Sequence, residues 1–368
     1  MPNNKVLETA VARGIISPAQ ANSIRLIETE ISGSTPQSVQ NIEANDEEGI
    51  RFASGFGDVF IALGIGTLLY GVMQTLLIES VLGIAAIGLI CWILAEIVCA
   101  WQKRSLPSIV TAIGFVISVI STTYFYTSGK HPSGFFDNLD FLLLTQDRII
   151  WLLPLSGLLA SIFFYLRFHL PFSLFLGALS FAIAMIVGVY STVDVVRFTS
   201  IIIPLLIVAG LLIFAAALHF DTKDRFRTSS LSDNAFWLHL VASPLIVHSI
   251  MWQSAIWITN TNGFSMRAIE AAASALSVVV LFIFLLLMLF ALIIDRRAML
   301  VSSLVYVTLA IGYLGSQTDG IASATSFVPI LLGAGILSVG VGWQTLRKFV
   351  FRILPLSPLE PYLSPVKQ

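Results

Sequence analysis

The feature that most constrains the fold is a succession of apolar segments, each about as long as a bilayer is thick. A helix needs about 20 apolar residues to cross about 30 Å of hydrocarbon. Segments of that length follow one another from residue 56 to residue 343, and the cleanest, from Ala271 to Ile294, contains no charged residue. The expected spans, about ten, are 56–78, 80–101, 106–127, 149–168, 170–190, 199–219, 235–257, 269–294, 298–314 and 326–343.

Composition excludes the other broad classes of protein. Hydrophobic residues make up 57% of the chain and charged residues 11%, whereas a soluble domain is about 25% charged. A net charge of −1 provides no field that would attract polyanions. A soluble enzyme, a disordered chain and a nucleic-acid-binding protein are therefore excluded. The sequence predicts an all-α integral membrane helical bundle.

The basic residues give the expected orientation. With ten spans and a cytoplasmic N-terminus, sixteen of the 20 Lys and Arg residues fall on the inner side. Only Lys130, Arg148, Arg197 and Arg267 fall outside. The positive-inside rule produces this bias, so we expect an even number of spans, near ten, with both termini in the cytoplasm.

Two polar regions flank the transmembrane domain, which we place at 51–345. Residues 1–50 have the pattern of a soluble helical hairpin followed by an acidic linker. The hairpin is too small to hold a core alone, so we expect it to pack on a copy of itself, on another protein or on the membrane surface. Residues 346–368 form an amphipathic, Pro-rich cytoplasmic tail, and its first part either extends the last span, lies in the membrane interface or is solvated.

Ionisable residues within spans are the candidate site residues, because hydrocarbon excludes unpaired charge. Glu96 lies within the second expected span and Asp58 at the start of the first. Glu96 either reaches the headgroups, pairs with Lys103 or Arg104, or forms a proton or cation site.

The seventh expected span carries the most unusual set of side chains, His239, Pro244 and His248, and we expect Asp233 to cap its helix. Nine residues separate the two imidazoles, so a straight helix directs them to opposite faces. Either could pair with Glu96 or Asp58 to relay protons or bind a metal. The alternative is a histidine hydrogen-bonded to a neighbouring helix.

A string of three ionisable residues, His219, Asp221 and Asp224, forms a candidate cytoplasmic mouth at the end of the sixth span. Helical spacing scatters these side chains around the axis, so ion pairs with Arg225 or Arg227 compete with a metal site. The metal, if any, is unknown, and we expect no cofactor. Cys91 and Cys99 are too far apart on one helix for a disulfide.

The third expected span carries small and hydroxyl residues, among them Gly114 and Ser118. Such a stripe usually lets helices approach closely. A translocation path lined by hydroxyl groups is the alternative interpretation.

Four stretches carry a family resemblance: 11–21 (VARGIISPAQA), 52–66 (FASGFGDVFIALGIG), 232–248 (SDNAFWLHLVASPLIVH) and 339–347 (VGVGWQTLR). Together they resemble a group of uncharacterised bacterial polytopic membrane proteins of the domain-of-unknown-function type. The resemblance implies a cytoplasmic helical pair followed by about ten spans in the bacterial inner membrane. It transfers no catalytic residue.

These observations leave three functional hypotheses. The first is a transporter or channel-like protein for a small solute or ion, with proton coupling as an option. The second is a membrane-anchored sensor or assembly scaffold that acts through the N-terminal hairpin. The third is an intramembrane metal-dependent hydrolase, although the sequence favours a non-enzymatic role. The expected partners are the lipid bilayer and, through the hairpin, a second copy or another protein, but no nucleic acid.

Overall fold

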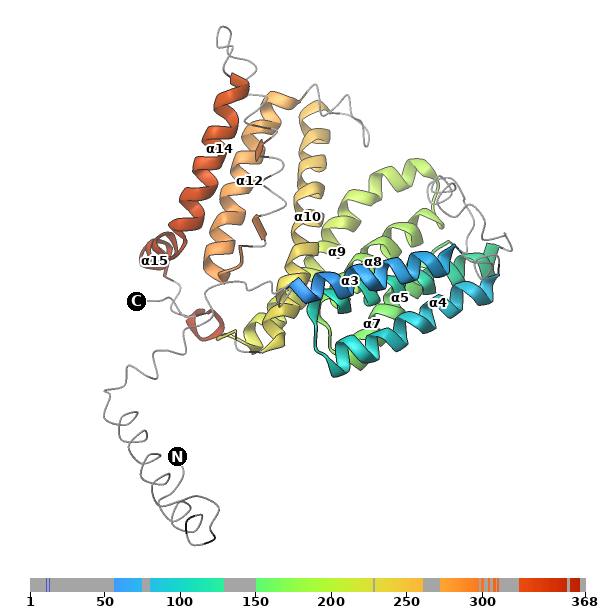
Figure 1. Cartoon of the computed structure of the whole chain (residues 1–368). Coiled ribbons are helices and arrows are strands. Elements are labelled where there is room, and N and C mark those ends of the chain that lie inside the picture. Colours follow the sequence, from blue (N-terminus) through green and yellow to red (C-terminus); the bar gives the residue numbers. More distant parts are fainter. Residues whose placement is uncertain are drawn as a thin grey trace. The chain divides into compact units, whose positions relative to one another are not determined.

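The computed structural model describes a chain of apolar helices (Figure 1). The described residues are 11, 13, 56–74, 80–128, 150–227, 229–260, 272–297, 299–300, 304, 307–308, 310, 324–355 and 358–364. Every regular element in these ranges is helical, and none is a strand. The elements are α3 (Phe56–Met73), α4 (Val81–Ala95), the π-helix η2 (Glu96–Trp101), α5 (Ser105–Ser128), α7 (Leu152–Phe168), α8 (Pro171–Tyr190), α9 (Val195–Lys223), α10 (Ser230–Thr259), α12 (Ala273–Ile294), α14 (Ala324–Val341), α15 (Trp343–Ile353) and the 3-10 turn η3 (Glu360–Tyr362).

Seven helices in the described part of the chain are long and apolar enough to cross a membrane. They are α3, α4 together with η2, α5, α8, α9, α10 and α12. The fourth expected span corresponds to the shorter α7, of 17 residues, and the tenth to α14, of 18 residues. Of the ninth, the structure describes residues 299–300, 304, 307–308 and 310, all of them helical. The all-helical class is confirmed, and the total of ten spans stays a prediction.

Local sequence signals set several helix ends. Ser80 has extended backbone and its hydroxyl accepts a hydrogen bond from Gly83 N at 3.0 Å, which caps α4. At the other end of the bundle, α7 stops at His169, whose φ of 51° is left-handed. Pro171 then begins α8, where its missing N–H costs nothing. The two helices are therefore joined by only two residues.

The helices α9 and α10 are longer than the sequence predicted. The helix α9 continues to Lys223, and α10 begins at Ser230 rather than near residue 235. Ser229 is the N-cap, with its hydroxyl accepting from Leu231 N, so the prediction that Asp233 caps this helix is wrong. Asp233 lies in the first turn instead, where a carboxylate complements the helix dipole.

Small residues allow close helix packing, as the stripe on the third span predicted. A Cβ added at Gly114 of α5 would lie 2.7 Å from the Cys91 sulfur of α4. The hydroxyl of Ser118 donates across the same interface to the Ile84 carbonyl at 2.6 Å. Cys91 and Cys99 are both free, as expected. The helices α4 and α5 are thereby held at short range.

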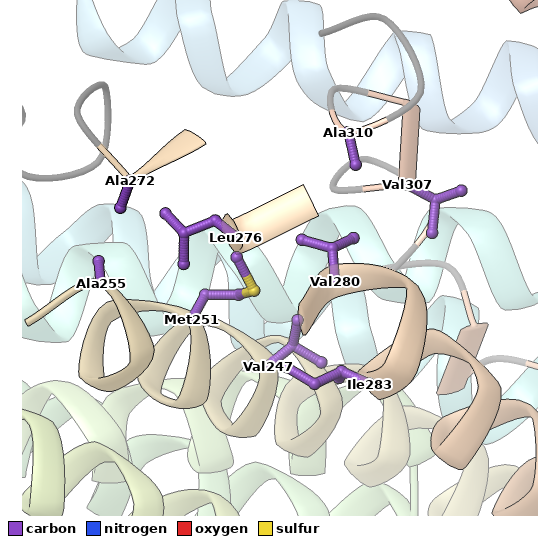
Figure 2. Close-up of a cluster of buried hydrophobic side chains, with 9 residues drawn as sticks. All are labelled: Val247, Met251, Ala255, Ala272, Leu276, Val280, Ile283, Val307 and Ala310. Carbon is purple, nitrogen blue, oxygen red and sulfur yellow. The ribbon is translucent and has the colours of Figure 1, made fainter. Parts of the chain in front are cut away.

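The apolar core between α10 and α12 is shown in Figure 2. Val247 and Met251 of α10 face Leu276, Val280 and Ile283 of α12. Ala255, Ala272, Val307 and Ala310 complete the cluster. Packing of this kind fixes α10 against α12 and so positions the polar residues at the ends of the two helices.

The N-terminal region is a unit by itself, residues 1–47, separate from residues 48–368. Of its residues the structure describes Val11, which is helical, and Arg13, which lies in a turn. The predicted hairpin and linker therefore lie outside the described residues.

Candidate functional site

Asp58 forms the first of the ion pairs that the structure brings together at the helix ends. It lies in the first turn of α3 and is fully buried. The guanidinium of Arg104, just before α5, donates to its carboxylate at 2.6 Å. The contact joins the start of α3 to the start of α5. The partner of Asp58 is therefore an arginine, whereas the sequence analysis considered a histidine as its partner.

Glu96 begins the six-residue π-helix η2, at the end of α4. Its carboxylate accepts from Arg167 of α7 at 2.7 Å, and the two side chains are 30% and 52% exposed. The sequence had suggested Lys103 or Arg104 as the cation. A pair this exposed is screened by its surroundings. We therefore interpret it as a surface ion pair that joins α4 and α7 rather than as a buried functional site.

A buried group of polar and charged side chains comprises Asp221, Ser232, His239 and Arg296, which we call the Asp221 network. Asp221 Oδ2 lies 2.7 Å from His239 Nε2, and Arg296 Nε donates to Asp221 Oδ1 at 3.0 Å. A second nitrogen of Arg296 donates to the backbone oxygen and the hydroxyl of Ser232, both at 3.1 Å. His239 is fully buried and Arg296 nearly so. The network joins α9, α10 and the chain just after α12.

The geometry assigns the proton on the imidazole. Asp221 accepts from Arg296 as a carboxylate, so Nε2 of His239 must donate to it. In the neutral ring Nδ1 then carries a lone pair. Among the described residues Nδ1 has no hydrogen-bond partner, although it is buried. Phe214 lies edge-on to the ring, with centroids 5.3 Å apart. With the ring neutral the network carries no net charge, and it contains one buried basic nitrogen that can take up a proton.

A second group of polar side chains adjoins the first along the backbone. Asp295 ends α12 in the left-handed conformation, with φ at 65°. Its carboxylate lies 3.4 Å from a nitrogen of Arg227 and 3.5 Å from a nitrogen of Arg347. The Trp343 indole donates to it at 2.7 Å and the Ser364 hydroxyl at 3.3 Å. We call these five residues the Asp295 network.

Neighbouring positive charges favour the ionised form of the Asp295 carboxyl group. Burial alone would raise the pKa of its carboxyl group, but Arg227 and Arg347, with the Trp343 N–H and the Ser364 hydroxyl, outweigh burial and hold that pKa below its usual value. Asp295 and Arg296 are adjacent in the chain. The end of α12 therefore supplies an anion to the C-terminal segment and a cation to the Asp221 network.

Asp224 adjoins the Asp295 network, because its carbonyl accepts a hydrogen bond from the Arg227 backbone N–H at 3.1 Å. Asp224 is buried and accepts from the Ser229 backbone N–H at 2.9 Å and from its hydroxyl at 2.7 Å, which fixes the turn between α9 and α10. His219 and His248 are both exposed. Of the seven predicted residues, the structure joins Asp221 and His239 by a hydrogen bond.

A metal site finds no support in the described part of the chain. There, no three His, Cys, Asp or Glu side chains come close enough together to hold a metal ion. The Asp221 network offers one carboxylate and one imidazole beside an arginine, and a guanidinium repels a cation. This donor set favours proton chemistry over metal binding.

Sequence reasoning missed two buried cations, Arg296 and Arg347, because it counted them only as charges of the inner loops. It named Arg227 as a partner for Asp221 or Asp224, and the structure pairs Arg227 with Asp295. One sequence signal could have identified Arg296. It belongs to the charged string Asp295-Arg296-Arg297, which comes directly after the uncharged apolar stretch from Ala271 to Ile294. A charge at that position has to meet the ends of neighbouring helices. Its actual partner depends on how α12 packs against α10.

Fold and site together define a helical membrane protein with several apolar spans and paired charges at its helix ends. No protein-family model, no curated protein and no solved structure matches the chain. The resemblance to bacterial polytopic membrane proteins therefore stays a prediction.

Proposed function

We propose that this protein is a transporter or channel-like protein for a small solute or ion, with proton coupling through the Asp221 network. The observation that carries the proposal is the fully buried His239, whose Nε2 faces Asp221 while its Nδ1 has no partner among the described residues. Ionisable groups retained within apolar helices usually mark ion or proton pathways.

The charge balance supports a coupled conformational change. Asp221 and Arg296 neutralise each other while His239 is uncharged. A proton on Nδ1 turns the ring into a cation and gives the network a net positive charge in a region of low dielectric. That charge is relieved when Arg296 moves toward water, which shifts the end of α12 relative to α9 and α10. Protonation then favours one arrangement of three helices over another.

The orientation of the site follows from the positive-inside rule. We infer that the ends of α4, α7, α9 and α12 and the starts of α3, α5 and α10 face the cytoplasm, in a bacterial inner membrane with both termini inside. The Asp221 network then lies close to the inner surface, where it could close a path from that side.

Proton flux in reconstituted vesicles tests the proposal. Purified protein is placed in liposomes that contain a pH-sensitive dye, and a pH gradient is imposed with the membrane potential clamped. We expect the wild type to raise the rate of proton entry above that of empty vesicles, and His239→Asn and Asp221→Asn to return it to that level. The matched control is His169→Asn, which removes an exposed histidine at a left-handed position that asparagine tolerates.

Two outcomes would contradict the proposal. One is wild-type vesicles whose proton permeability, and whose swelling in small neutral and charged solutes, match those of empty vesicles. The other is flux that persists unchanged in both the His239→Asn and the Asp221→Asn variants, because the network would then lie outside the path.

A further inference from the structure

The C-terminal helix α15 has two chemically different faces. It begins at Trp343, and one residue, Gly342, separates it from the end of α14 at Val341. The two axes are steeply inclined: Figure 1 shows α14 along its length and α15 nearly end-on. It is therefore a separate short helix and does not extend the last span. Because residues three and four apart share a helix face, its eleven residues divide into an inner and an outer side.

The inner face is fixed to the end of α12. Trp343 and Arg347 are almost completely buried, and Arg347 Nε donates to the Leu292 carbonyl at 3.0 Å. Leu346 and Val350 pack against the same apolar cluster as Trp343. Arg347 also donates to the Ser364 hydroxyl at 2.8 Å, which ties the tail to the helix. These contacts fix which side of α15 points away from the protein.

The outer face combines exposed apolar and cationic side chains. Phe349 and Ile353, one turn apart, are 61% and 60% exposed. Lys348 and Arg352, also one turn apart and next to them on the helix surface, are exposed too. Beyond the helix, the tail adds the exposed Tyr362. The helix α15 itself contains no acidic residue.

We propose that this outer face is a binding surface for anionic phospholipid headgroups, with Phe349 and Ile353 inserted at the boundary of the acyl chains and with Lys348 and Arg352 bound to phosphate. A short helix with apolar residues beside a basic stripe is the form that lies in a membrane interface. Lys and Arg at such a surface each gain from an anionic leaflet.

Continuity with α14 favours lipid over another protein. The helix α14 has 18 mostly apolar residues, and Ile336, Leu337 and Val341 on it are exposed up to the point where α15 begins. A lipid-facing surface that ends at Val341 leads directly to the headgroup layer. A second copy of the chain would bring Lys348 and Arg352 near identical charges, which repel.

Photo-crosslinking in vesicles of defined composition tests this. Benzoylphenylalanine replaces Phe349 in the full-length protein, which is reconstituted into equimolar phosphatidylcholine and phosphatidylglycerol, and the adducts are identified by mass spectrometry. We expect phospholipid adducts enriched in phosphatidylglycerol. The double variant Lys348→Gln/Arg352→Gln should reduce that enrichment, by about fivefold for each charge removed.

Two controls separate the specific result from general effects. Benzoylphenylalanine at Val350, which packs inward, should yield crosslinks within the protein. Lys223→Gln removes an exposed cation at the end of α9 and should leave the adducts at position 349 unchanged. Circular dichroism confirms that the double variant keeps its helices.

Three outcomes would overturn the proposal. A covalent dimer formed from position 349 would identify the outer face as an interface between copies. Absence of any adduct would identify it as solvated. Lipid adducts with no preference for phosphatidylglycerol, or with a preference that the double variant retains, would refute recognition of headgroup charge.

Discussion

The carboxylate of Asp295 holds two buried arginines, so its neutralisation should destabilise the protein strongly. Arg227 and Arg347 are 7% and 1% exposed, and each has a nitrogen within 3.5 Å of Asp295 Oδ2. Asp295→Asn keeps the shape of the side chain and removes the charge. Both guanidinium groups then lie buried beside a neutral amide.

The expected loss of unfolding free energy depends on how deeply the ion pair is buried, so we compare the Asp295 pairs with the exposed Glu96–Arg167 pair. Removing one partner of a buried ion pair costs about 3–5 kcal/mol. Because Arg227 and Arg347 also donate to backbone carbonyls, we expect the lower end, about 3 kcal/mol, or roughly a hundredfold in the unfolding equilibrium. Glu96→Gln breaks the exposed pair with Arg167 and should cost less than about 1 kcal/mol.

Reversible unfolding in mixed detergent micelles, followed by circular dichroism, gives the free energy of unfolding of both variants and of the wild type. The Glu96→Gln variant is the matched control, because it too turns a paired carboxylate into an amide at a helix end. Trp343 fluorescence supplies a local signal, since its indole N–H donates to Asp295.

The reasoning would be refuted by an Asp295→Asn variant as stable as Glu96→Gln with unchanged Trp343 fluorescence. Buried charge at the end of α12 would then contribute no more than charge at the surface. A Glu96→Gln variant that lost several kcal/mol would be equally damaging, because it would reverse the order that exposure predicts.

Other predictions concern pH and packing. The pKa of Asp295 is lowered in the folded protein. Its ion pairs therefore stabilise the fold fully at pH values above the unfolded pKa of about 4, and this stabilisation is lost as the pH falls through the folded pKa. The unfolding free energies of the wild type and of Asp295→Asn should consequently converge in acid. Gly114→Ala places a methyl group 2.7 Å from the Cys91 sulfur and should cost about 1–3 kcal/mol, whereas Gly64→Ala, with nothing within 4 Å of the added methyl, should cost less than about 0.5 kcal/mol by the same unfolding measurement. Asp58→Asn weakens a charge-assisted hydrogen bond to a half-exposed arginine and should cost about 1.5–3 kcal/mol; an unchanged unfolding free energy would argue against that contact.

Several features of the fold were predictable because they depend on residues close together in the chain. Apolar length alone located the helices from α3 to α12, since a lipid-spanning segment needs about 20 such residues. Close approach of another helix to α5 followed from the small side chains around Gly114, whereas the identity of that helix, α4, came from the structure. The free state of Cys91 and Cys99 followed from their spacing on one helix.

Helix boundaries near charged residues were harder to predict. Asp221, Lys223 and Ser230 lie outside the spans that the apolar pattern predicts, because they are polar or charged, yet the helices include them. The charge of Asp221 is compensated by Arg296, from another part of the chain, which local pattern does not reveal. This extension is also what brings Asp221 within 2.7 Å of His239.

By itself the sequence determined the class of this protein, because a chain with 11% charged residues and spans of bilayer length can satisfy its backbone in lipid only as helices. The pairing of each acidic residue with its arginine was decided by the tertiary structure alone. Arg296 is 75 residues from Asp221 in the chain, and Arg104 is 46 from Asp58. Such pairs form only where packed helix ends bring a cation and an anion together, because an unpaired charge there would be expelled to water or to the headgroups.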